Sequence, residues 1–185
     1  MKKRSDNKTR LFHDTILVYL DSAYNYAHWL SRNPHDAEDL TQEACTRAYA
    51  AFDKFKPNNP KSWLLTIVRH TFLNQKQKEQ RRGEVVYLDS ISPLTTTPTA
   101  LQDNHTPEKE LLRQHDAKLV HTAINELNIE FREIIILREI EGLSYNEISA
   151  ITDCALGTVM SRLSRARNQL KSKLTIAIKK TENKA

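Results

Sequence analysis

Residues 143–174 have the sequence LSYNEISAITDCALGTVMSRLSRARNQLKSKL. The segment Ser144-Tyr-Asn-Glu147 has the form of a capping box, in which a serine and a glutamate satisfy free amides at a helix start. A short break with Gly157 follows, and apolar residues then recur at helical spacing from Val159 to Leu174. Two helices joined by such a turn predict a helix-turn-helix, whose second helix lies in the major groove of DNA.

The second of these helices is strongly basic. Residues 158–180 carry seven lysines or arginines and no acid. Arginine can bond a guanine edge with two donors or bind phosphate, so the outward positions are candidates for DNA contact. The alternative interpretation is a solvated basic helix in an ordinary bundle. The candidate residues are Thr158, Met160, Ser161, Arg162, Ser164, Arg165 and Arg167.

The rest of the chain also favours helices. It has 185 residues with only 3 glycines and 6 prolines, which predicts an all-α protein of one medium or two small domains. An apolar face from Phe12 to Leu30 predicts a first helix. Asn33-Pro34, Asn59-Pro60 and Thr106-Pro107 each have the form of a cap followed by proline at the first helical position. They predict helices over 34–55 and 60–82 and a further helix from 107.

Residues 83–106 contain two prolines and little helical spacing, which indicates a flexible linker. We therefore predict two helical domains, 1–82 and 107–185, joined by the linker 83–106. Charge is unevenly distributed in the first domain. Residues 36–53 carry five acids and one base, whereas residues 61–82 carry six bases and one acid. Two basic stripes fit two contacts with a polyanion, and the acidic stretch needs a different partner.

Two longer segments carry a resemblance to a known family. Phe131 to Ile148 is similar to the first part of the C-terminal DNA-binding domain of extracytoplasmic-function (ECF) sigma factors, a group of the sigma-70 family. Gly157 to Arg167 resembles the recognition helix of that domain. The resemblance implies recognition of the minus-thirty-five promoter element, with Ser161, Arg162 and Arg165 facing DNA. Asn128 and Ala155 stand where this family commonly has proline.

An independent resemblance covers Asp36 to Tyr49, which is similar to the polymerase-binding helix of the same family. It implies docking on the beta-prime subunit of core RNA polymerase through Asp36, Glu38, Asp39, Gln42 and Glu43. For Asp36 and Glu38, a favourable interaction with the helix dipole is an alternative explanation.

Lys61 to Arg82 resembles the helix that captures the melted minus-ten element. Basic side chains and flat or polar pockets suit a single strand. At two of these positions, His70 and Asn74, the family more often has asparagine and aspartate. Trp63 is a core residue or a stacking platform, and Arg69 is a structural residue that bonds the second helix or a DNA contact. The candidate residues are Lys61, Trp63, Arg69, His70, Asn74, Lys76, Lys78, Arg81 and Arg82.

The family further implies contact with the beta subunit, promoter DNA as a partner, an anti-sigma factor, and a linker near the polymerase active-site cleft. No further domain is expected at either end, unlike in housekeeping sigma factors. The sequence shows no catalytic motif, no metal-ligand spacing, and no apolar run of the roughly 20 residues that span a membrane. We expect a cytoplasmic protein without a cofactor that is not an enzyme. The alternatives are a helix-turn-helix regulator that binds duplex DNA without polymerase, and a helical adaptor that binds only proteins.

Overall fold

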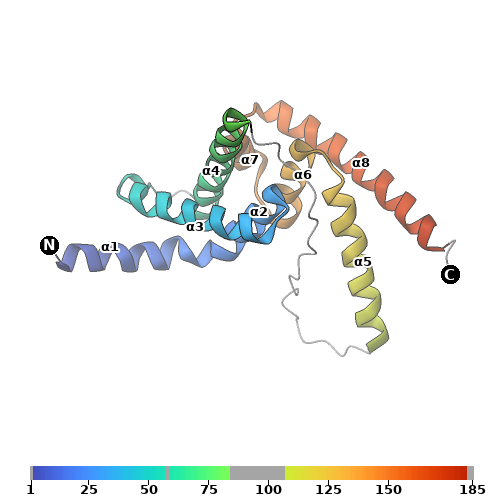
Figure 1. Ribbon diagram of the computed structural model, residues 1–185, viewed down its shortest axis with the longest axis horizontal. Helices are drawn as coiled ribbons and strands as arrows, with labels where there is room; N and C mark the ends of the chain where they lie inside the picture. Colours follow the sequence, from blue (N-terminus) through green and yellow to red (C-terminus); the bar gives the residue numbers. More distant parts are fainter. Residues whose placement is uncertain (1, 57–58, 84–106, 183–185) are drawn as a thin grey trace.

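The structure, a computed structural model, describes residues 2–56, 59–83 and 107–182, and within these ranges all regular structure is helical (Figure 1). The all-α prediction is confirmed. Apart from Gly83, the predicted linker lies outside the described residues.

The N-terminal apolar face forms two α-helices rather than one. Helix α1 spans Lys2–Thr15, a 3₁₀ turn η1 spans Leu17–Tyr19, and α2 spans Leu20–Ser31. The break follows Ile16, which is fully buried, and it changes the direction of the chain. Leu20 lies within the apolar face predicted from Phe12 to Leu30, but it is 40% exposed, so its expected burial is wrong.

The next two helices begin where their caps predict. Helix α3 spans Pro34–Ala51, followed by a 3₁₀ turn η2 at Phe52–Lys54, and α4 spans Pro60–Arg82. The Asn33 side chain accepts hydrogen bonds from two first-turn amides at 2.9 and 3.4 Å, and Asn59 accepts one from Ser62 at 3.1 Å. Helices α2, α3 and α4 pack on one another.

The C-terminal half contains α5 (Pro107–Asn125), α6 (Ile129–Ile135), a π-helical turn η3 (Ile136–Ile140), α7 (Tyr145–Thr152) and α8 (Leu156–Glu182). The Ser144 capping box is confirmed, and Asp153 ends α7 with a φ of 51°. Helix α8 packs against α5, α6 and α7. On α5, Val120 is 40% exposed, whereas Ala123 and Ile124 on the next turn are buried.

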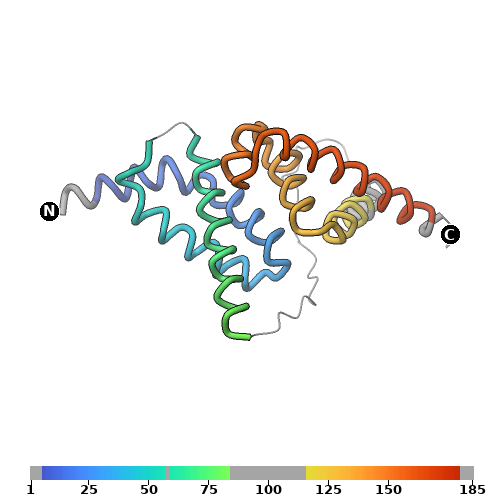
Figure 2. Tube along the Cα trace, turned by 90° about the horizontal axis from the view of Figure 1, so that it is seen from above, coloured from blue at the N-terminus to red at the C-terminus, as the bar shows by residue number. Residues whose placement is uncertain are grey.

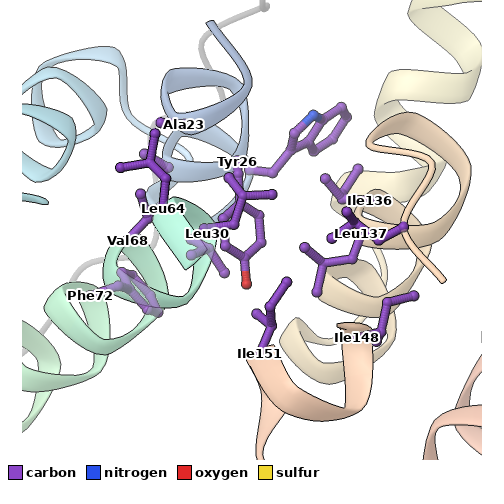
Figure 3. Close-up of a cluster of buried hydrophobic side chains, with 14 of the residues drawn as sticks. Ala23, Tyr26, Leu30, Leu64, Val68, Phe72, Ile136, Leu137, Ile148 and Ile151 are labelled. Carbon is purple, nitrogen blue, oxygen red and sulfur yellow. The ribbon is translucent and has the colours of Figure 1, made fainter. Parts of the chain in front are cut away.

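The two halves share one hydrophobic core. Figure 2 shows α4 of the first half lying against the start of the C-terminal helix-turn-helix, and α4 packs on α7 while α2 packs on α6 and η3. In Figure 3, Tyr26 and Leu30 lie between the side chains of α4 and those of η3 and α7. The buried residues of both halves form a single cluster. This packing of the two halves against each other, called the closed arrangement below, therefore has a shared apolar core.

No helix in the described ranges is long and apolar enough to cross a bilayer. The same ranges contain no group of three or more histidine, cysteine or acidic side chains that could hold a metal ion.

Candidate nucleic-acid and protein interfaces

The acidic surface lies on the first turns of α3. Asp36, Glu38, Asp39 and Gln42 are exposed, and Glu43 is half-buried with its carboxylate 2.7 Å from Nε of Arg47. These residues are three or four positions apart, so they follow adjacent rows on the helix surface. The structure thus brings together all five candidates for polymerase binding.

An open apolar groove of about 720 Å³ runs beside this surface. Glu38 and Gln42 also line this groove, so polar and apolar contacts adjoin. Burial raises the pKa of the Cys45 thiol, which indicates an inert side chain at neutral pH. The apolar part of the lining consists of Phe12, Leu17, Leu20, Tyr24, Cys45 and Tyr49.

The distal half of α4 presents a basic surface. Lys76 is half-buried and pairs with Glu79 at 2.8 Å, which leaves its neighbours further along as the exposed cations. Gly83 ends the helix in the left-handed conformation, with φ of 70°. The exposed candidates on this half are His70, Asn74, Lys78, Arg81 and Arg82.

The proximal half of α4 faces the C-terminal half of the protein. Lys61 Nζ lies 2.8 Å from Oε2 of Glu141 and donates to the Glu141 carbonyl at 2.9 Å. Arg69 Nε donates to Oε1 of Glu133 at 2.8 Å. The bond that one alternative predicted between Arg69 and the helix over 34–55 is therefore wrong, because Glu133 lies on α6. Trp63 is half-buried, and its ring centroid lies 4.6 Å from that of Phe55.

Glu133 is the centre of a buried polar network. Its Oε1 also accepts a hydrogen bond of 2.6 Å from the hydroxyl of Tyr26, which is fully buried. Burial, together with the negative charge of Glu133, raises the pKa of Tyr26 well above its usual 10.0. The hydroxyl therefore stays protonated and acts as a donor.

Two arginines bridge the halves elsewhere. Arg132 Nη1 donates to the Trp29 carbonyl at 2.9 Å, and Arg32 Nη2 donates to the Asn125 carbonyl at 2.6 Å. Burial, and then the charge of Arg32, lower the pKa of Arg132 to about 10. Sequence analysis did not find these two contacts because their partners lie 93 and 103 residues apart in sequence.

The recognition helix presents a mixed surface. Val159 and Leu163 are buried, as their spacing predicts. Arg162 is half-buried, with Nη2 3.3 Å from a carboxylate oxygen of Glu130 and Nη1 3.2 Å from the sulfur of Cys154. Its predicted outward orientation holds only in part.

Most of the remaining candidates on the recognition helix are exposed, and some of them also form hydrogen bonds within the protein. Thr158 is half-buried, and its carbonyl accepts the Ser161 hydroxyl at 3.1 Å. Arg167 donates to Oε1 of Glu139 at 2.6 and 2.9 Å. The exposed candidates are Met160, Ser161, Ser164, Arg165 and Arg167.

Comparison with known proteins assigns the family. Residues 16–82 match Sigma-70 region 2, and residues 117–170 match Sigma-70, region 4. The chain is 35% identical over 164 residues to the ECF RNA polymerase sigma factor EcfG of Rhodopseudomonas palustris, a match that spans 88% of this chain and 84% of that protein. The chain belongs to the ECF sigma factors. It is therefore an alternative sigma factor, which directs promoter-specific transcription, and not an independent regulator.

Two further relatives agree with this assignment. The ECF RNA polymerase sigma factor SigE of Mycolicibacterium smegmatis is 35% identical over 164 residues, which is 87% of this chain but only 60% of that relative. The fold matches the sigma factor RpoE of Bartonella quintana, solved in complex with the anti-sigma factor NepR, with a TM-score of 0.70 and 33% identity. That match covers 89% of this chain and 97% of the RpoE chain.

Proposed function

We propose that this sigma factor binds core RNA polymerase through α3, captures the minus-ten strand with α4, and binds the minus-thirty-five duplex with α8. The observation that carries the proposal is the placement of three surfaces of different chemistry on three separate helices. The exposed acids lie on α3, and exposed bases lie on α4 and α8. We place this activity in the cytoplasm, with no catalytic chemistry of its own.

The polymerase contact combines charge with apolar burial. Asp39 and Glu43 supply negative charge beside the neutral Gln42, and the adjoining groove supplies apolar area for a helical partner. Charged pairs orient a complex and speed its formation, while apolar burial supplies most of the affinity. This arrangement fits a basic, amphipathic helical segment such as a coiled coil of the beta-prime subunit.

The minus-ten contact uses the exposed end of α4. Lys78, Arg81 and Arg82 suit the phosphates of a single strand, and His70 and Asn74 lie one turn apart on the exposed surface, where they can hydrogen-bond an unstacked base. We propose that Trp63 is mainly structural, because its ring packs on Phe55.

The minus-thirty-five contact uses the first turns of α8. Ser161, Ser164 and Arg165 are exposed, so they can reach base edges without a rearrangement. Arg162 must first leave Glu130 to contact DNA. We also propose an anti-sigma factor as a partner, supported by the complex in which the RpoE neighbour was solved.

The test is run-off transcription with purified core polymerase on promoter fragments from the genome that encodes this protein. Transcripts that appear only with the protein, and that start near two spaced motifs, would support the proposal. Asp39→Ala with Gln42→Ala should weaken core binding about tenfold, as expected for central interface residues. His35→Ala, an exposed change in the same helical turn, should not.

The DNA surfaces are tested separately. Arg165→Ala should cost about 1–3 kcal/mol on the native promoter if the side chain bonds a base, with a smaller loss on promoters that differ there. Arg81→Ala with Arg82→Ala should weaken all promoters alike and reduce the salt dependence. If the Arg165→Ala variant transcribes every promoter as well as the wild type does, Arg165 is not part of the DNA surface.

A further inference from the structure

Arg162 lies at the border between the buried surface and the DNA-facing surface of α8. It directly precedes Leu163, which is 1% exposed, and it follows the fully buried Val159 by three residues. On its other side lie Ser161 and Arg165, both of which are exposed. A side chain at this border can turn toward DNA or toward the protein. Arg162 turns toward the protein, and its side chain is 29% exposed.

The guanidinium of Arg162 has partners in two other elements. Its Nη2 lies 3.3 Å from a carboxylate oxygen of Glu130 on α6, and its Nη1 donates to Sγ of Cys154 at 3.2 Å. Cys154 belongs to the turn between α7 and α8. Because a guanidinium is planar and rigid, two bonds to it fix a direction as well as a distance. One side chain thus ties the recognition helix both to α6 and to the turn before it.

The two partners of Arg162 are held in place by contacts of their own. The thiol of Cys154 donates to the Thr152 carbonyl at 3.4 Å, and the Cys154 carbonyl accepts the Ser149 hydroxyl at 2.5 Å. Glu130 lies in the first turn of α6, where a negative charge interacts favourably with the helix dipole. The partners are therefore positioned by α6 and α7 and can serve as fixed points for α8.

This ion pair affects geometry more than stability. The Glu130 side chain is 57% exposed, and pairs this open to water contribute little to stability because solvent screens the charges. Hydrogen bonds to base edges, in contrast, weaken steeply when the donor points away from the acceptor. A small rotation of α8 that leaves its apolar core intact would thus misdirect Ser161 and Arg165.

We propose that Arg162 is a positioning residue, which through Glu130 fixes the rotation of α8 so that Ser161 and Arg165 meet the base edges of the minus-thirty-five element. The proposal rests on the proposed contact of α8 with that element. In this role Arg162 stays bonded to Glu130 on DNA and contacts neither a base nor a phosphate. Its loss relaxes the base preference of its neighbours without removing a phosphate contact.

The experiment uses the full-length protein with core polymerase. Its template is the strongest promoter from the run-off assay, with the minus-thirty-five element randomised, and barcoded transcripts report the base preference at each position. Arg162→Ala and Glu130→Gln should each reduce the preference for the best base by about fivefold or more, the lower range for one base contact. Because both changes act through one ion pair, the double variant should lose no more than Arg162→Ala alone.

Glu126→Gln is the matched control. Glu126 pairs with Lys173 of α8 at 2.9 Å, and the two side chains are 56% and 32% exposed, close to the values of the Glu130–Arg162 pair. Lys173 lies about three turns further along α8, away from the DNA candidates. The control should leave the base preference unchanged. Thermal denaturation of each variant shows that it is folded before it is assayed.

The salt dependence of promoter binding separates positioning from phosphate contact. Loss of one phosphate contact reduces the slope of log affinity against log salt by about one, whereas loss of a positioning residue leaves the slope unchanged. A slope reduced by about one in Arg162→Ala would overturn the proposal, as would a base preference that Glu130→Gln leaves unchanged or sharpens. The same conclusion follows if the two single losses multiply in the double variant, or if Glu126→Gln causes an equal loss. Absent transcription by the wild type would instead overturn the proposed function, on which this role depends.

Discussion

Replacing Tyr26 with phenylalanine removes a single oxygen atom from the interface between the two halves. The ring is fully buried and its hydroxyl donates to Oε1 of Glu133 at 2.6 Å. Arg69 donates to the same oxygen at 2.8 Å, so the carboxylate keeps a charged partner in the variant. The change therefore tests one hydrogen bond while ring packing is retained.

The expected loss of stability follows from the charge of the acceptor. A hydrogen bond to a charged group contributes about 1.5–3 kcal/mol, and the remaining Arg69 bond places Tyr26→Phe near the lower end of that range. For a chain of this size, such a loss lowers the melting temperature by about 3–8 °C. Tyr49→Phe is the control, because the Tyr49 hydroxyl bonds Thr9 on the exposed surface. It should change stability by less than about 0.5 kcal/mol.

The pH dependence gives the same test a second readout. Burial and Glu133 raise the pKa of Tyr26 in the folded protein, so the unfolded chain loses this proton first as the pH rises. The stabilisation is complete below the unfolded pKa of about 10 and is lost as the pH increases above it. Urea denaturation should show the difference between wild type and Tyr26→Phe shrinking from neutral to alkaline pH. A variant as stable as wild type at neutral pH would refute the buried bond, and with it the closed arrangement in solution.

Three further changes have definite outcomes. Leu163→Ala should destabilise the protein by about 2–5 kcal/mol in thermal denaturation, because the side chain is 1% exposed in the helix-turn-helix core. Ser144→Ala should cost about 1 kcal/mol through loss of the α7 cap, whereas Ser164→Ala, on the exposed surface of α8, should have little effect by the same measurement. Burial, and then the neighbouring His121, lower the pKa of His28, so stability should be complete above the usual pKa of about 6.5 and fall as the pH decreases below it. His28→Leu removes the titrating ring, so it should reduce this acid sensitivity in urea denaturation. The substitution loses no hydrogen bond, because neither ring nitrogen of His28 has a partner. An unchanged pH profile would assign the sensitivity to another group.

The parts of the fold that the sequence predicts are those set by local chemistry. Helices α3 and α4 begin at Pro34 and Pro60 because an asparagine precedes each and caps the first turn. The capping box at Ser144 likewise marks the start of α7. These signals need only neighbouring residues, so no knowledge of the partner helices is required.

The parts that could not be predicted depend on distant residues. The spacing from Phe12 to Leu30 is compatible with one helix, and only packing determines the break after Ile16. The partner of Arg69 is Glu133, 64 residues away, and one acid is not distinguished from another by local pattern. The orientation of Arg162 is missed for the same reason, since Glu130 belongs to another helix.

The shared core has a consequence for engineering. Sigma factors of this size invite construction of hybrids, in which one parent supplies polymerase docking and another supplies promoter choice. In this protein the half-buried cations Lys61 and Arg69 lie on one side of any such junction, and their buried acids Glu141 and Glu133 lie on the other. A hybrid that takes only one half from this protein has charged side chains without their partners where the two halves meet. These four residues and Tyr26 should therefore be transferred together when a hybrid is built.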